Sequence, residues 1–148
     1  MFSVQAELRQ LVWRFAAEKV PYALCGALAL AVHGYPRATL DIDLLALAGS
    51  GELIRRCAHE CGFTLKAAPM QFADGKVRIE RWSKVFPDEE DILMLDVLSL
   101  ASEIEQATTL EELTWQGMQL VVVTRESLVR LKMLRGSAQD LADVEKLR

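Results

Sequence analysis

The feature that most limits how this chain can fold is the segment 39–47, TLDIDLLAL, which is apolar except for two aspartates placed one residue apart. In a β-strand, side chains two positions apart point to the same face, and their Cα atoms are separated by roughly 6.6 Å. Asp41 and Asp43 therefore share one face, and Ile42 and Leu44 share the other. Two like charges at this spacing oppose each other's ionisation. The segment predicts a strand with an apolar face and a face that carries two carboxylates.

Two interpretations of this pair are open. A divalent cation would relieve the repulsion between the carboxylates, or Asp41 and Asp43 simply decorate the wet face of an edge strand. Asp96 favours the cation, because it lies in the apolar segment ILMLDVLSL, which resembles a central strand covered on both faces. An unpaired charge there would be costly to bury.

If the strand with Asp96 lies beside the strand with Asp41 and Asp43, three carboxylates converge as oxygen ligands of the kind that Mg²⁺ and Mn²⁺ prefer. Two such ions about 3.5–4 Å apart stabilise the attacking and leaving oxygens of a phosphoryl displacement. For Asp96 alone, the alternatives are an ion pair with a buried arginine and a position near the wet end of its strand.

The residues ahead of the aspartates supply groups that a phosphate would need. Gly26 follows a short apolar run and lets the backbone come close to a ligand. A helix that begins at Ala27 would present unpaired N–H groups with a partial positive charge. Arg37 precedes Asp41 by four residues and could either extend over a phosphate or cap that helix.

Composition excludes several classes of protein. At 148 residues, with 51% hydrophobic and 26% charged residues, the chain is typical of one globular domain with one core, and we expect residues 1–148 to form it. The formal net charge of −4 repels nucleic acid and other polyanions. Any phosphate must therefore be bound by a local group of residues or by a metal.

Nothing in the sequence predicts a leader or a membrane span. The first ten residues contain Glu7 and no basic region ahead of an apolar core. The longest apolar stretch, 23–32, is shorter than the ~20 residues that cross a bilayer. The three cysteines, Cys25, Cys57 and Cys61, are an odd number, which suits a reducing compartment. We therefore expect a cytoplasmic protein with no membrane partner.

Hydrophobic periodicity changes several times along the chain and predicts an α/β or α+β fold with a mixed sheet. Helices are expected at residues 3–18, 27–33, about 51–61, from about 102, 125–135 and from 137 onward. Strands are expected at residues 22–25, 39–47, 63–66, 77–85, 92–98 and 119–123. Gly62 is expected to end the third helix.

One predicted strand carries a basic face. Lys76, Arg78, Glu80, Trp82 and Lys84 share a parity, which places three cations and an aromatic ring together. Such a face could bind an RNA backbone and stack a base on Trp82, or it could be a solvated face over a partly covered tryptophan.

The segment 25–43 resembles the start of the nucleotidyltransferase superfamily related to DNA polymerase beta, and above all its small bacterial branch of abortive-infection and toxin–antitoxin proteins. The residues that carry this resemblance are Cys25-Gly26-Ala27, His33-Gly34, Pro36-Arg37, Thr39 and Asp41-Ile42-Asp43. The C-terminal LVRLKMLRGSAQDLADVEKL is also similar to the closing helices of that branch, through Lys132 and Asp140. The alternative for this segment is that Ser137 caps the last helix and that Asp140 is favourable in its first turn.

The resemblance implies a nucleotidyltransferase fold with C-terminal helices and a magnesium- or manganese-dependent enzyme. Asp41, Asp43 and Asp96 would hold the metal and catalyse the transfer of a nucleoside monophosphate from an NTP to a hydroxyl on RNA, such as tRNA, or on protein. The implied nucleotide-binding residues are Gly26, Ala27, Arg37, Thr39, Lys132 and Asp140.

Two positions depart from the family pattern. Cys25 replaces the first glycine, and Ala27 stands where active members often have Ser or Thr. A hydroxyl that would bind the triphosphate is therefore missing. The alternative reading is a catalytically silent copy of the fold that acts as a binding partner, for example as one half of a toxin–antitoxin pair. The intact carboxylate trio favours the enzyme.

Overall fold

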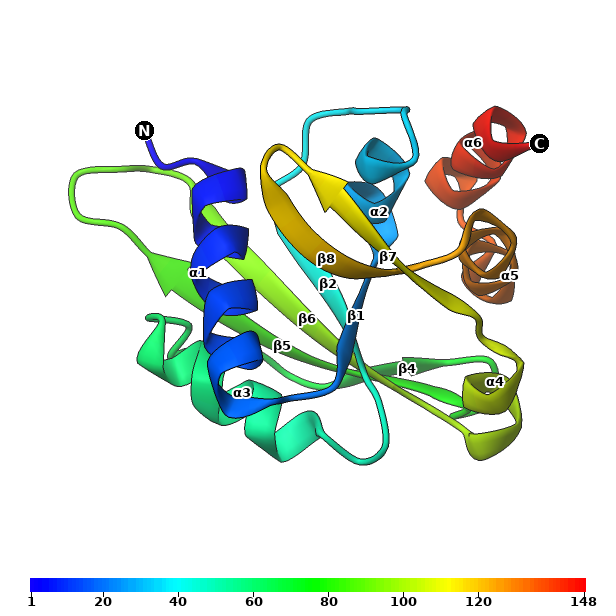
Figure 1. The fold of residues 1–148 in the computed structure, drawn as a ribbon, viewed down its shortest axis with the longest axis horizontal. Coiled ribbons are helices and arrows are strands. Elements are labelled where there is room, and N and C mark those ends of the chain that lie inside the picture. The colour runs from blue at the N-terminus through cyan, green and yellow to red at the C-terminus, as the bar shows by residue number, and fades with distance from the viewer.

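The computed structural model describes residues 1–148 as a mixed sheet of eight strands with six helices (Figure 1). The helices are α1 (Val4–Glu18), α2 (Gly26–Val32), α3 (Gly51–Glu60), α4 (Ser102–Ala107), α5 (Arg125–Arg135) and α6 (Ala138–Leu147). The strands are β1 (Tyr22–Cys25), β2 (Asp41–Ala46), β3 (Leu65–Lys66), β4 (Met70–Phe72), β5 (Val77–Val85), β6 (Ile92–Leu100), β7 (Leu110–Trp115) and β8 (Met118–Val123). The predicted fold class is confirmed.

The sheet has the order β3-β5-β6-β2-β1-β8-β7, and β4 pairs with β5. Strand β2 runs parallel to β6, and β1 runs parallel to β8, while the other pairs are antiparallel. Because β2 lies between β6 and β1, the interpretation of its aspartates as decoration of an edge strand is wrong. The prediction that the strand with Asp41 and Asp43 lies beside the strand with Asp96 is confirmed.

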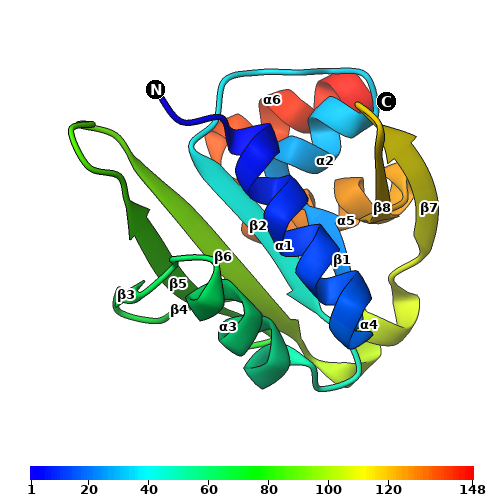
Figure 2. The same cartoon turned by 60° about the vertical axis from the view of Figure 1, so that its left-hand side comes forward.

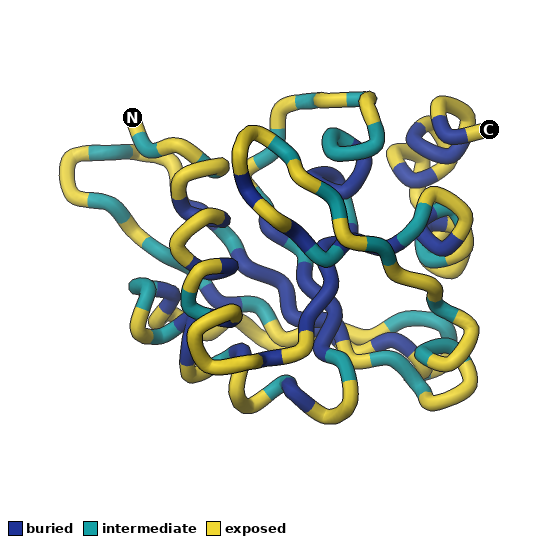
Figure 3. Tube along the Cα trace, in the orientation of Figure 1, coloured by how far each residue is buried: buried dark blue, intermediate teal, exposed yellow.

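The helices form two groups around the central strands (Figures 1 and 2). Helices α1 and α3 pack together over β2 and β6, and α2 lies near α5 and α6. Helix α1 begins after Ser3, whose side chain accepts a hydrogen bond from the backbone N–H of Ala6, and it buries Leu8, Leu11 and Phe15. Figure 3 shows the buried residues concentrated where β1, β2 and β6 meet.

The apolar face of β2 carries much of this core. Ile42 and Leu44 are both fully buried, as the alternation in TLDIDLLAL predicts, and they belong to one continuous hydrophobic cluster with α1. The two aspartates consequently point to the opposite face, toward the side where α2 and α5 lie.

The proposed RNA-stacking role of Trp82 is wrong. Trp82 is 7% exposed and belongs to the core, with the ring of His59 on α3 packed edge-on at 4.6 Å between centroids. Lys84 on the same strand face forms an ion pair with Glu7 of α1 at 2.9 Å. Sequence parity correctly put these residues on one face, but α3 and α1 cover the part of it that holds Trp82 and Lys84, which parity does not reveal.

Other differences concern short or amphipathic elements. Strands β4 and β7 were not expected, because β4 has only three residues and the acidic segment of β7, LEELTW, is not typical of a strand. In α3, Leu53 is 38% exposed, whereas its apolar neighbours Ile54 and Cys57 are buried. Gly62 does follow the end of α3, with φ +99°. No helix is both long enough and apolar enough to cross a membrane.

The burial of Trp82 leads to a stability prediction. Trp82→Ala should lower the free energy of unfolding by about 3–5 kcal/mol, because it leaves a large cavity under α3. Trp13→Ala is the matched control, since Trp13 is 77% exposed and its loss should cost less than about 0.5 kcal/mol. Urea denaturation of both variants measures the difference, and equal midpoints would contradict the packing described for Trp82.

Candidate active site

The turn from β1 into α2 brings the backbone against an aspartate. Cys25 is the register partner of Asp43 in the antiparallel β1–β2 pair, and Gly26 follows with φ +68°. A β-carbon at Gly26 would collide with the carboxylate of Asp43. Glycine is required here both because the φ is positive and because the Asp43 side chain occupies the space that a β-carbon would need.

The parallel pair β2–β6 places two carboxylates side by side. Asp43 is the register partner of Asp96, and Asp41 is the partner of Met94. Neighbouring strands lie roughly 4.8 Å apart, and Asp41 shares the face of Asp43. Three carboxylates therefore gather on one face of the sheet, as expected for neighbouring strands, but on inner strands and not at an edge of the sheet.

Asp96 has a cationic partner that sequence analysis offered only as an alternative. Arg81 of β5 is the register partner of Asp96 in the antiparallel β5–β6 pair. Its Nε donates to Oδ1 at 2.7 Å and its Nη2 donates to Oδ2 at 2.9 Å. This fork uses both carboxylate oxygens, and the side chain of Asp96 is only 7% exposed.

Asp43 and Asp41 do not have such partners. Burial, followed by the negative charges of Asp96 and Asp41, raises the pKa of Asp43 from its ordinary value to about 7. Burial and the charge of Asp96 also raise the pKa of Asp41, against the opposing effect of Arg81. Asp41 bonds to Thr39 only through its main chain. The face therefore holds negative charge that is not fully compensated.

A small cavity of about 50 Å³ lies beside Asp43 and Gly26. Lys132 and Arg135 of α5 and Asp140 of α6 also line it. The structure thus brings together four predicted site residues, Asp43, Gly26, Lys132 and Asp140, from β2, α2, α5 and α6. Arg135 joins them without having been predicted.

Lys132 is held by a carboxylate in this structure. Its Nζ donates to Oδ2 of Asp143 at 2.9 Å, and Arg37 donates to the same oxygen at 3.1 Å. Gln139 donates to the other oxygen at 3.0 Å. Burial alone would raise the pKa of Asp143, but the hydrogen bonds from Lys132, Arg37 and Gln139 hold it below its ordinary value. Asp143 is fully buried, so α6 depends on these donors.

Asp140 has a structural role that accounts for its position. It forms a capping box with Ser137, whose hydroxyl accepts from the Asp140 backbone N–H. Arg135 also donates to both of its carboxylate oxygens, at 2.6 and 2.8 Å. Burial would raise the pKa of Asp140, but the bonds from Arg135 and Ser137 lower it. The Ser137 cap predicted from the sequence is confirmed.

The remaining predicted nucleotide-binding residues do not line this cavity. Arg37 and Thr39 border a separate cavity of about 380 Å³ near the N-terminus. Thr39 accepts a hydrogen bond from the backbone N–H of Asp41 through its hydroxyl and so supports the start of β2. Ala27 is 6% exposed and forms part of the first turn of α2.

The three carboxylates are chemically suited to a divalent cation, but their arrangement in this structure is not that of a metal site. No group of three or more His, Cys, Asp or Glu side chains is arranged to hold a metal ion. Asp41, Asp43 and Asp96 offer the oxygen donors that Mg²⁺ and Mn²⁺ prefer. Both oxygens of Asp96, however, are bonded to Arg81. The residues fit a cation if Asp96 leaves Arg81.

Sequence analysis missed Arg81 and Arg135. Arg81 has the opposite parity to the basic face of β5, so it faces the carboxylates, but only the β5–β6 register shows that it meets Asp96. Arg135 lies in the last turn of α5, where a basic residue is ordinary and carries no signal of its own.

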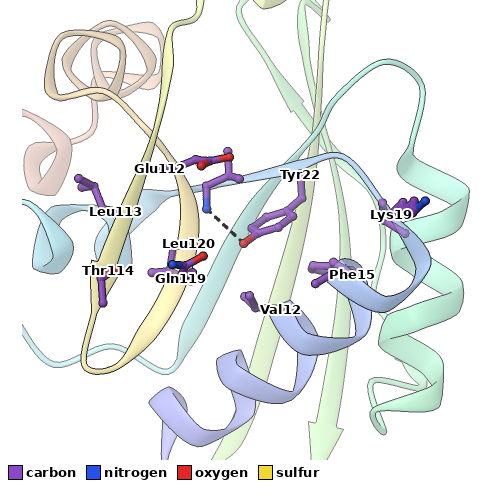
Figure 4. Close-up of a pocket in the computed structure, with 12 residues that line it drawn as sticks. Val12, Phe15, Lys19, Tyr22, Glu112, Leu113, Thr114, Gln119 and Leu120 are labelled. Atoms are coloured by element: carbon purple, nitrogen blue, oxygen red, sulfur yellow. Dashed lines mark hydrogen bonds between the residues drawn. The ribbon is translucent and has the colours of Figure 1, made fainter.

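A larger cavity of about 420 Å³ lies away from the carboxylates (Figure 4). It lies between α1 and the strands β1, β7 and β8, and Val12, Phe15 and Leu120 are among its apolar lining. The hydroxyl of Tyr22 accepts a hydrogen bond from the backbone N–H of Val121 at 3.2 Å. None of the predicted site residues lines this cavity.

The raised pKa of Asp43 gives a pH-dependent prediction. In the unfolded chain this group ionises near pH 3.9, whereas in the folded protein it does so at about 7. Its stabilising effect is therefore present below about pH 4 and is lost as the pH rises through 7. Without metal, Asp43→Asn should raise the free energy of unfolding at pH 8 by roughly 1–3 kcal/mol and flatten the pH dependence of Tm between 4 and 7.

Thermal melting of wild type and variant from pH 4 to 8 checks this prediction. Asp91→Asn is the control because Asp91 is exposed in the loop before β6. A Tm of Asp43→Asn that stays below that of wild type at pH 8 would show that the carboxylate is structurally required.

Replacing Asp143 should destabilise the protein, in contrast to replacing Asp43. Asp143→Asn should lower the free energy of unfolding by about 3–5 kcal/mol, because it leaves buried Lys132 without a negative partner. Glu145→Gln on the same helix removes an exposed charge and should cost less than about 0.5 kcal/mol. Urea denaturation at pH 7 compares them, and a Glu145→Gln loss as large as that of Asp143→Asn would refute a special role for the buried network.

Comparisons with known proteins support the fold. No protein-family model and no curated protein matches the sequence. Among solved structures, a candidate nucleotidyltransferase from Thermotoga maritima (TM1012) has a TM-score of 0.64 at 16% identity, over 96% of this chain and 90% of that one. The antibiotic-resistance factor ANT(2″)-Ia, solved with adenylyl-2″-tobramycin, has a TM-score of 0.69 at 12% identity, over 98% and 88% of the two chains.

An antigenic nucleotidyltransferase-like protein from Paracoccidioides brasiliensis also matches, with a TM-score of 0.55 at 16% identity over 98% of this chain and 76% of that one. The similarity to these proteins extends over nearly the full length of this chain. The chain therefore has the nucleotidyltransferase fold.

Proposed function

We propose that this protein is a metal-dependent nucleotidyltransferase that moves a nucleoside monophosphate from an NTP to a hydroxyl group of an acceptor. The observation that carries the proposal is the register of β2 and β6, which sets Asp43 beside Asp96 with Asp41 on the same face. The turn at Gly26 brings backbone directly against this face.

The electrostatics of the face support a bound cation. Burial and two neighbouring carboxylates raise the pKa of Asp43 to about 7. A divalent ion would therefore stabilise the ionised form of Asp43 more than it would stabilise that of an exposed aspartate. Asp41, Asp43 and Asp96 would hold Mg²⁺ or Mn²⁺. When bound, the ion would neutralise negative charge on the triphosphate.

The chain's own residues have three tasks in this proposal. Gly26 gives the triphosphate close access to backbone N–H groups at the start of α2. Lys132 and Arg37 supply positive charge, and because both now neutralise Asp143, the triphosphate must compete with that carboxylate. Asp96 accepts the proton of the acceptor hydroxyl through a carboxylate oxygen.

The acceptor is the less determined half of the reaction. Trp82 is buried and Lys84 is paired with Glu7, so the aromatic ring and one of the cations that the sequence offered to RNA are not available. The formal net charge of −4 also opposes a polyanion. These observations favour a protein hydroxyl over an RNA hydroxyl. In ANT(2″)-Ia the adenylyl group is found on tobramycin, so the fold also accommodates a small acceptor.

A second candidate function is a silent copy of the fold that binds a partner, such as one half of a toxin–antitoxin pair. Three observations favour it. Ala27 lacks a hydroxyl at the start of α2, and both oxygens of Asp96 are held by Arg81. The cavity beside Gly26 is also small, at about 50 Å³.

Transfer of label from each of the four α-³²P-labelled NTPs tests the enzyme directly. Purified protein, Mg²⁺ or Mn²⁺ and a cell lysate should yield a labelled acceptor, and Asp41→Asn and Asp43→Asn should each reduce labelling by at least about a thousandfold, because each removes a metal ligand. Asp91→Asn should label as wild type does. Nuclease and protease treatment of the product then separates RNA from protein acceptors.

Melting curves separate the enzyme from the silent copy. A divalent ion that binds only the folded protein stabilises it by about 2.7 kcal/mol at a hundredfold excess over Kd. The Tm of wild type should therefore rise by several degrees with metal and further with an NTP, while that of Asp41→Ala should not. Equal shifts in both proteins, or none at millimolar ligand, would favour the binding partner.

A further inference from the structure

The contact between Arg81 and Asp96 is the one ion pair that any of the three carboxylates makes. It is a two-pronged contact at 2.7 and 2.9 Å, and both partners come from neighbouring strands at matched register. The Asp96 side chain is 7% exposed and that of Arg81 is 28% exposed. The pair therefore lies at the boundary between the covered face and solvent.

Arg81 acts on more than Asp96. Its charge also lowers the pKa of Asp41, and the carboxylates of Asp96, Asp41 and Asp43 together raise the pKa of Arg81. The guanidinium of Arg81 therefore interacts with all three carboxylates, as does that of Arg135, but only Arg81 is hydrogen-bonded to one of them. Because arginine keeps its charge at every accessible pH, this compensation does not disappear on titration.

We propose that Arg81 is a built-in counter-ion that competes with a divalent cation for the carboxylate of Asp96. In the metal-free protein Arg81 holds Asp96 and keeps the three carboxylates from forming a metal site. When the cation binds, the carboxylate exchanges its two hydrogen bonds from Arg81 for the ion. Arg81 is in this sense a positioning residue, and the inference rests on the proposed function.

The structure explains why this exchange is possible. Both oxygens of Asp96 accept hydrogen bonds from Arg81, so they cannot bind a cation at the same time. In this arrangement no group of three carboxylates is placed to hold a metal ion. Arg81 lies on β5 and not on β2, so it can move without disturbing the strand that carries the other two ligands. Its partial exposure leaves space in which the side chain can turn toward solvent.

Direct metal binding tests the competition. Mn²⁺ is titrated into wild type, Arg81→Ala, Arg81→Lys and Arg78→Ala, and the free ion is followed by electron paramagnetic resonance. Arg81→Ala should lower the Kd for Mn²⁺ about tenfold, because the competitor is gone. Arg81→Lys keeps the charge but loses the two-pronged contact, and its Kd should lie between those of Arg81→Ala and wild type.

Arg78→Ala is the matched control. Arg78 is on the same strand, is exposed and contacts none of the three carboxylates, so its loss removes an equal charge from β5. It should change the Kd less than twofold. A Kd for Arg81→Ala that equals that of Arg78→Ala would overturn the inference and leave the proposed function standing. If neither wild type nor any variant binds Mn²⁺, both the proposed function and the competition fail.

A second measurement uses the unmodified protein, in case Arg81→Ala does not fold. The ¹⁵N–¹H signal of Arg81 Nε, assigned by its absence from Arg81→Lys, is followed while diamagnetic Mg²⁺ is added. The signal should shift or broaden with the same midpoint as Mg²⁺ displacement of Mn²⁺. A signal that remains unchanged at saturating Mg²⁺ would show that Arg81 stays on Asp96 and would overturn the inference.

Discussion

The repulsion among carboxylates that share one face of the central sheet is the constraint on which the rest of this structure depends. β2 and β6 are parallel neighbours with Asp43 opposite Asp96, so the charges cannot separate without breaking the sheet. The protein meets this constraint in two ways. Arg81 neutralises Asp96, whereas Asp43 retains a proton to about pH 7. A sheet built for stability alone would gain by replacing such residues with apolar ones.

The C-terminal helices follow the same electrostatic logic with a different result. Asp143 and Asp140 of α6 are both buried, and each has a basic partner on α5, Lys132 and Arg135 respectively. These pairs join α5 to α6, and Arg37 extends the network to the segment before β2. The basic residues that border the candidate site are thus already neutralised, so an incoming triphosphate would meet cations held in place by carboxylates.

The two sets of ion pairs differ in how completely they are covered. Lys132 and Asp143 are almost entirely shielded from water, and breaking that pair would strand a buried charge. Arg81 retains partial exposure, so its side chain has solvent as an alternative environment. The Lys132–Asp143 pair therefore stabilises the fold, whereas the Arg81–Asp96 pair can take part in the chemistry of the site.

The sequence by itself determined the three aspartates and most of the helices and strands, with β4 and β7 as the exceptions. The alternation in TLDIDLLAL placed Asp41 and Asp43 on one face, and the apolar surroundings of Asp96 marked it as a buried charge that needs a partner. Ser137 and the residues that follow it predicted the cap of α6. These features were readable because they depend on local spacing along one strand or one helix.

Only the tertiary structure decided which charge meets which. Arg81 reaches Asp96 through the β5–β6 register, Lys132 reaches Asp143 through the packing of α5 on α6, and α3 covers the face of β5 that holds Trp82. Parity gives the two faces of a strand but not what packs on them, and register depends on pairing between segments distant in the sequence. The partners of buried charges are therefore a property of the folded sheet.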